Sequence, residues 1–200
     1  LRQAFGTGKA LTSHIVHRPG GEVLDAQDID TAHLVIVTDI LDRRNIAPLR
    51  RYLEAGKSLL LVLKSAETGA ALSALAGVGS GASGEAEVNL YAMLGRLEFE
   101  HPLLKPFSDP RFGDFTRIHF WKYRRIAAAD YPGARVLARY DNDDPAWLEI
   151  PVGKGALLVW TSGWQPSDSD LALSSKFVPL LYGTLEYGGT LPSRQSQYFI

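Results

Sequence analysis

Polar side chains come directly after an apolar run near residue 60. Lys64, Ser65 and Glu67 follow residues 59–63, which are all Leu or Val. A serine near a carboxylate suggests a nucleophile with an orienting group, but serine chemistry also needs a base within reach and usually a GxSxG turn. Neither is visible here. We therefore expect Ser65 to cap the helix that follows, without capping-box support from Thr68.

Two more apolar runs also end in polar residues. Asp39 follows residues 33–38, and Ser162 and Trp164 follow residues 156–161. In an open α/β sheet, ligands bind just beyond the carboxyl ends of the strands. Capping of the last helix would also explain much of the polarity after residue 161. We predict no catalytic residue, and the ligand-binding candidates are Asp39, Lys64, Ser65, Ser162 and Trp164.

The five histidines form no metal-binding pattern. His14 and His17 are three residues apart, which places them on opposite faces of a strand, and neither HxH nor HExxH occurs. The absence of cysteine excludes disulfides, thiolate metal sites and cysteine nucleophiles. We predict neither a metal site nor a cofactor.

Basic and aromatic residues are densest between residues 111 and 125. Alternation over residues 114–126 predicts a strand. Its side chains could bind an anionic ligand, a partner peptide or single-stranded nucleic acid. Alternatively, it is an edge strand whose charges prevent pairing with other chains. Nearby aspartates offset the charge, so we expect no nucleic-acid partner; the partner-binding candidates are Arg117, Trp121, Lys122 and Arg124.

A βαβ crossover is predicted to position Lys64, Ser65 and Glu67. Residues 33–38, 45–55 and 58–63 are typical of a strand, a helix and a strand that pairs in parallel with the first. Pro48 suits the first turn of the helix, and Gly56 suits its end. Because residues 59–63 do not alternate with polar residues, we expect a central strand that is buried on both faces.

The remaining elements follow from periodicity and turn residues. They are a short strand at 11–17, a polar loop at 25–30, a helix at 67–75, one or two strands within 87–98, a meander at 135–140, 146–151 and 156–161, and a closing helix at 174–187. The glycine-rich residues 77–84 follow a helix and match neither GxxxxGK[ST] nor GxGxxG, so they predict a linker and not a phosphate loop.

The composition is that of an ordinary globular protein. The chain has 200 residues, 46% hydrophobic and 22% charged, with a net charge of −1, which argues against a general nucleic-acid or membrane-surface binder. No run approaches the ~20 apolar residues of a membrane span. We expect one α/β domain over residues 1–190 and an extension over 191–200. The first residues include neither Met nor a signal-peptide core, which suggests a piece of a longer protein.

The C-terminal half carries a family resemblance. The segments HPLLKPFSDPRFGDFTRIHFWKYRRI and VLARYDNDDPAWLEIPVGKGALLVWTSGW resemble the glutamine-amidotransferase-like domain of large bacterial membrane proteins. Those proteins carry a BatA-type transmembrane segment and often a von Willebrand factor A domain. The resemblance implies a flavodoxin-like, class I glutamine-amidotransferase-like three-layer sandwich, with a mainly parallel sheet and antiparallel edge strands. It also implies a membrane-anchored parent protein on the periplasmic side of the cell envelope.

The same resemblance argues against amidotransferase chemistry. It implies a nucleophilic cysteine at or near Leu63 and a His-x-Glu motif before the last helix. This chain has leucine at the first place and SGWQPSDSD, without histidine, at the second. A leucine side chain cannot attack a carbonyl carbon.

Three functions remain open. The first is a non-catalytic interaction or ligand-binding domain of an envelope protein, without membrane insertion of its own, whose partners are domains of the same protein or complex. The second is a degenerate or repurposed hydrolase at the strand ends. It requires a polar pocket where Asp39, Lys64, Ser65 and residues 161–164 converge. The third is a structural spacer.

Overall fold

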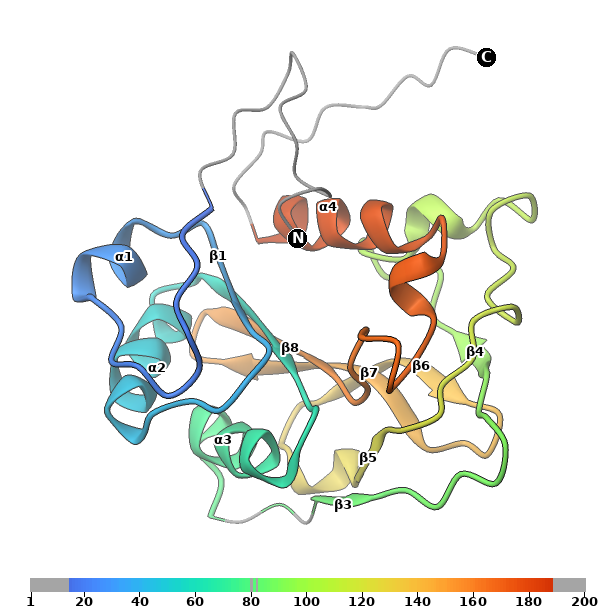
Figure 1. Ribbon diagram of the computed structural model, residues 1–200. Coiled ribbons are helices and arrows are strands. Elements are labelled where there is room, and N and C mark those ends of the chain that lie inside the picture. The colour runs from blue at the N-terminus through green and yellow to red at the C-terminus, as the bar shows by residue number, and fades with distance from the viewer. Residues whose placement is uncertain (1–14, 80, 82, 189–200) are drawn as a thin grey trace.

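The structure, a computed structural model, describes residues 15–79, 81 and 83–188. Its main feature is a six-stranded sheet between two layers of helices and loops (Figure 1). The strands, in spatial order, are β1 (Leu34–Val37), β2 (Ser58–Val62), β8 (Gly155–Trp160), β7 (Pro145–Val152), β6 (Arg135–Tyr140) and β4 (Leu94–Leu97). The first three are parallel, and each later strand is antiparallel to its neighbour. Four of the six strands therefore run in one direction.

Helices cover both faces of the sheet. One face carries α1 (Ala26–Thr31), α2 (Ile46–Glu54) and α3 (Ala66–Ala76), and the other carries α4 (Phe177–Tyr187). Alternate side chains of β2 pack on opposite faces of the sheet. Leu59 and Leu61 belong to the core under α2 and α3, whereas Leu60 and Val62 belong to the core under α4. All of β2 is buried, as its uninterrupted apolar run predicts.

The crossover packs closely because of a glycine in the β7–β8 turn. A Cβ atom on Gly155 would lie 2.3 Å from the carbonyl oxygen of Leu53, at the end of α2, and 2.2 Å from that of Lys57. Gly56 ends the helix with a φ of +97°, a backbone conformation that glycine adopts without strain. These glycines allow α2 to lie directly against the start of β8.

Most of the predicted elements are confirmed. The crossover, the α3 helix, the meander and the closing helix are all present, although the last begins at Phe177 and not at residue 174. The predicted loop at 25–30 is wrong. It contains α1, because the Asp25 side chain caps the helix at the Gln27 N–H and Ile29 is buried.

Two predicted backbone assignments are also wrong. Part of the glycine-rich linker forms β3 (Ser83–Glu85), which pairs with β5 (Arg124–Ile126). The long strand predicted over 114–126 is reduced to β5, and the residues before it run through turns. They bury Phe115, Ile118 and Phe120, a spacing that a flat strand cannot place on one face.

The ends of the chain add little to these comparisons. Residues 15–17 form no strand, and the rest of the predicted strand at 11–17 lies outside the described residues. The predicted extension at 191–200 also lies outside them. None of the helices in the described ranges is both long enough and apolar enough to span a bilayer.

Candidate functional site

The parallel strands β1, β2 and β8 bring three polar segments to one edge of the sheet. Asp39 lies two residues beyond β1, Lys64 and Ser65 lie beyond β2, and Ser162 lies beyond β8. We call this edge the strand-end rim. Asp39 is exposed, and its carboxylate accepts a hydrogen bond from the N–H of Ile40 at 2.8 Å. The other three residues of the rim, Lys64, Ser65 and Ser162, each take part in a hydrogen bond within the fold.

Ser65 caps α3, as its position predicts. Its hydroxyl accepts the Thr68 N–H at 3.4 Å, and the Thr68 hydroxyl accepts the Ser65 N–H at 3.0 Å. This is a full capping box, so the expectation that Thr68 gives no such support is wrong. Hydrogen bonding by Ser65 also holds the pKa of Glu67 below its usual value. No histidine contacts Ser65 within the described residues, and the geometry is that of a helix cap.

Ser162 and Trp164 point into the fold. The Ser162 side chain donates to the carbonyl oxygen of Lys122 at 2.6 Å, and Ser162 is only 3% exposed. Trp164 packs edge-to-face against Trp160 and Phe177, with ring centroids 5.6 and 5.3 Å away.

Arg124 closes the rim between β2 and β5. Its guanidinium lies 3.1 Å from the Glu85 carboxylate and donates to the carbonyl oxygen of Lys64 at 3.4 Å. Its backbone N–H donates to the carbonyl oxygen of Thr161 at 2.7 Å. The hollow that remains beside Leu63 has a volume of about 10 Å³. A single water molecule needs roughly 10–15 Å³, so this hollow between β2 and β5 is too small for a substrate.

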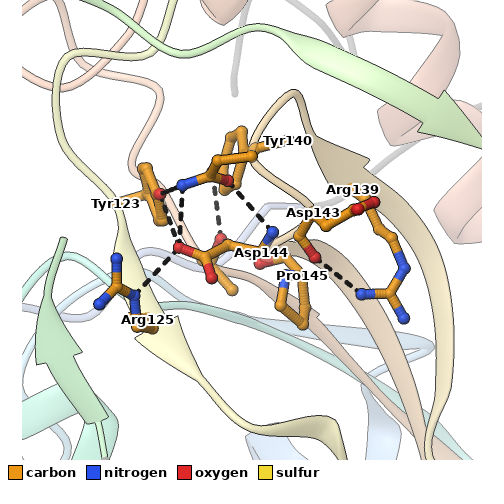
Figure 2. Close-up of polar contacts among 9 residues, drawn as sticks. Tyr123, Arg125, Arg139, Tyr140, Asp143, Asp144 and Pro145 are labelled. Carbon is orange, nitrogen blue, oxygen red and sulfur yellow. Dashed lines mark hydrogen bonds and ion pairs between the residues drawn. The ribbon is translucent and has the colours of Figure 1, made fainter.

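A polar network joins the residues on either side of Arg124, Tyr123 and Arg125, to the turn between β6 and β7 (Figure 2). Tyr123 donates to the Asp144 carboxylate at 2.7 Å, and Arg125 donates to the same oxygen at 3.1 Å. Asn142 donates to the Tyr123 hydroxyl at 2.7 Å and to Asp144 at 3.1 Å. The turn between β6 and β7 is thereby tied to β5, and the figure shows Arg139 reaching the carbonyl oxygen of Asp143 at the far end of that turn.

The network shifts two ionisation equilibria in opposite directions. Burial, with the bond to Asp144, raises the pKa of Tyr123. Burial alone would raise the pKa of Asp144 as well, but the hydrogen bonds from Tyr123 and Arg125 outweigh it and hold that pKa below its usual value. Tyr123 therefore stays neutral and Asp144 stays ionised, which is the pairing that the hydrogen bonds require.

An aromatic surface lies where three segments meet. Phe120 bridges to Ala92 on one side and to Ser169 on the other, and all three are buried. Two of their sequence neighbours face solvent: Tyr91 is 41% exposed and Trp121 is 40% exposed. We call this area the Trp121 surface. Its exposed residues are Leu90, Tyr91, Arg117, Trp121, Lys122 and Leu173.

The partner-binding candidates divide accordingly. Arg117, Trp121 and Lys122 are exposed, whereas Arg124 is held by Glu85 with 15% of its side chain exposed. Three of the four predicted residues are thus accessible to solvent, and Arg124 belongs to the closed part of the rim.

The sequence did not single out an oriented histidine on the Trp121 surface. The Asp170 carboxylate accepts the His119 backbone N–H at 2.8 Å and its Nδ1–H at 3.1 Å, and the ring of Tyr91 lies 4.3 Å from the imidazole. Because an ionised carboxylate only accepts, Nδ1 carries a proton in this contact. The two residues are 51 apart in sequence, so no local pattern could have paired them.

No metal site accompanies these groups in the described part of the chain, where no three His, Asp or Glu side chains come together. Comparison with known proteins gives no family assignment, since no protein family and no curated protein matches the chain.

Solved structures with similar folds do exist. The cytoplasmic protein STM3548 from Salmonella typhimurium matches with a TM-score of 0.62 at 15% identity, over 82% of this chain and 74% of that one. The cytoplasmic protein STM1381 from Salmonella typhimurium LT2 gives the same values. A ThuA-like protein from Parabacteroides merdae matches with a TM-score of 0.54 at 14% identity, over 92% of this chain and 81% of that one.

These structures confirm the predicted fold class, a flavodoxin-like, class I glutamine-amidotransferase-like α/β domain. They contradict the predicted location. Both Salmonella proteins are described as cytoplasmic, which points away from the periplasmic side of the envelope, and that prediction is wrong.

Proposed function

We propose that this chain is a non-catalytic binding domain that recognises another protein, or another domain of its own protein, through the Trp121 surface. The single observation that carries the proposal is the closed strand-end rim. In open α/β sheets, ligands bind outside the carboxyl ends of the strands. Here Arg124 and Ser162 are held by hydrogen bonds at the ends of β2 and β8, and the hollow beside Leu63 has a volume of about 10 Å³.

The chemistry of the Trp121 surface supports a protein partner. Tyr, Trp and Arg are enriched at the energetic centres of protein interfaces. Trp121 and Tyr91 present large rings to solvent, and Arg117 and Lys122 border them with positive charge. The backbone beneath is held by the bridges through Phe120, so little conformational entropy is lost when a partner binds.

A more specific kinship, with domains of proteins that carry a von Willebrand factor A domain, remains part of this proposal. Such a neighbouring domain would be the first partner to test.

The test is affinity capture from an extract of cells that express the protein. Three baits are compared: the wild type, Trp121→Ser and the matched control Phe112→Ser, which removes another exposed ring outside the Trp121 surface. We expect the wild type and the Phe112 variant to capture the same partner and the Trp121 variant to lose it, with unchanged thermal unfolding for all three. Equal capture by the Trp121 and Phe112 variants would contradict the proposal.

The hydrolase alternative has its own test. If Ser65 were a nucleophile, Ser65→Ala would abolish any hydrolysis of activated esters by the purified protein, whereas Ser65→Asp would retain the helix cap without the nucleophile. We expect the wild type and both variants to be equally inactive.

A further inference from the structure

A basic groove lies at the opposite end of the sheet from the β1 edge. It has a volume of about 710 Å³ and is lined by Arg96 and Glu98 from the β4 side, by Arg135, Val136 and Arg139 from β6, and by residues 128, 129 and 131–134. The wall residues include three alanines, a proline and a glycine, which allow a backbone to approach closely. The groove shares no residue with the Trp121 surface.

The charges of the groove are poorly compensated. Arg96 and Arg139 are direct partners across β4 and β6, an arrangement of like charges that is unfavourable in a sheet. Asp143 offsets them only in part: its carboxylate lies 3.7 Å from Arg96, and both side chains are about 70% exposed, 68% for Arg96 and 73% for Asp143. Arg139 donates to the carbonyl oxygen of Asp143 and forms no ion pair within the described residues, whereas Arg135 lies directly opposite Glu149 across β6 and β7.

The neighbouring strand offers a template for an extended chain. β4 is the last strand of the sheet and has no partner strand on its outer edge in the described structure, although Phe120 bridges to Ala92 two residues before β4. Strands with an open edge bind extended peptides through main-chain hydrogen bonds, and flanking pockets read alternate side chains. Here the flanking groups on one face are the guanidinium groups of Arg96 and Arg139.

We propose that an acidic, extended segment of a partner protein adds to the outer edge of β4 and places its carboxylates in the groove with Arg96 and Arg139. Charge complementarity selects this occupant. The lining carries three arginines against one glutamate, although the whole chain has a net charge of −1. A second copy of this chain would bring its own Arg96 to the same edge, so self-pairing would add like charges.

The probe is a labelled ten-residue peptide of alternating Glu and Val, measured by fluorescence anisotropy against the full chain. Its controls are the Lys-Val peptide, a Glu-Val peptide with two central residues replaced by proline, and an oligothymidylate of ten nucleotides. The tested variant is Arg96→Glu with Arg139→Glu. The charge-matched control is Arg43→Glu with Arg51→Glu, which changes exposed arginines outside the groove.

We expect the Glu-Val peptide to bind with an affinity that falls with salt, falls at least tenfold in the groove variant and stays unchanged in the control variant. The proline peptide should bind at least tenfold more weakly, because proline cannot donate to a strand ladder. Hydrogen exchange at Leu97, whose N–H faces away from β6, should slow in the complex. Equal binding by both variants, equal binding of the proline peptide, or tighter binding of the oligothymidylate would each overturn the proposal.

This test is separate from that of the Trp121 surface. The groove variant should still capture the partner of the Trp121 surface, and the Trp121→Ser variant should still bind the acidic peptide. Either proposal can therefore fail while the other stands.

Discussion

The hydroxyl of Ser162 donates a hydrogen bond to the backbone carbonyl oxygen of Lys122 at 2.6 Å. Ser162 follows the central strand β8, and Lys122 belongs to the segment that lies across the ends of the parallel strands. Ser162 lies where an open α/β sheet usually places a ligand-binding group. The hydrogen bond to Lys122 makes it part of the closure of the rim instead.

Ser162→Ala should lower the free energy of unfolding by about 1–3 kcal/mol, because the buried carbonyl oxygen of Lys122 loses its donor. Chemical denaturation measures this change. Ser108→Ala is the control, since Ser108 is exposed and its side chain forms no hydrogen bond within the described residues. An equal effect of the two substitutions would contradict the proposed role of Ser162 in closing the rim.

The network around Asp144 predicts a pH dependence of stability. The pKa of this carboxyl is lowered in the fold, so its contribution is present above the unfolded-state pKa of about 3.9 and is lost as the pH falls through the folded-state pKa. The stability difference between the wild type and Asp144→Asn should therefore be largest near neutral pH and should shrink below about pH 4. Denaturation at several pH values measures it. Asp141→Asn, on the same turn, should show no comparable trend.

Glu149 joins α4 to the sheet. Its carboxylate accepts the Tyr187 hydroxyl and lies 3.2 Å from Nε2 of His101, which is 1% exposed. The Leu103 N–H donates to Nδ1 of the same ring, so Nε2 carries the proton.

Glu149→Ala leaves both donors without their acceptor and should cost about 1–3 kcal/mol for the buried His101, with a smaller loss for the half-buried Tyr187. Denaturant unfolding tests this, with Glu186→Ala, an exposed glutamate on α4, as the control. If both variants unfold alike, the carboxylate does not hold the helix.

Gly155→Ala should be among the most damaging small substitutions. The new methyl group would meet backbone oxygens of Leu53 and Lys57, which cannot rotate away. Overpacking of this kind costs about 1–3 kcal/mol or more. Gly84→Ala is the matched control, because a Cβ there meets nothing within 4 Å. Thermal unfolding of the two variants should separate them clearly, and equal melting temperatures would refute the close approach.

Hydrophobic pattern and turn residues were sufficient to predict the frame of the fold. The apolar run at 59–63 predicts β2, and Pro48 with Gly56 predicts α2 between β1 and β2. These predictions succeed because they depend only on residues that are neighbours in sequence. An uninterrupted apolar run indicates a strand buried on both faces, and proline and glycine mark the start and end of a helix.

The same reasoning failed where local pattern and packing disagree. Residues 114–123 alternate like a strand, yet Phe115, Ile118 and Phe120 enter the core at intervals set by the loops that they meet. Periodicity carries no information about those partners. The predicted basic-aromatic face was therefore divided between the rim and the Trp121 surface.

The sequence by itself determined the class of the fold and the absence of cysteine chemistry, since both depend on residue types and short-range spacing. Only the tertiary structure decided which polar groups meet. Ser162 with Lys122, His119 with Asp170 and Arg96 with Arg139 are each separated by about forty residues or more in the chain. Such pairs arise from strand register and loop packing, which are set by the burial of the whole core. The residue type and the local sequence at either position therefore do not predict the partner.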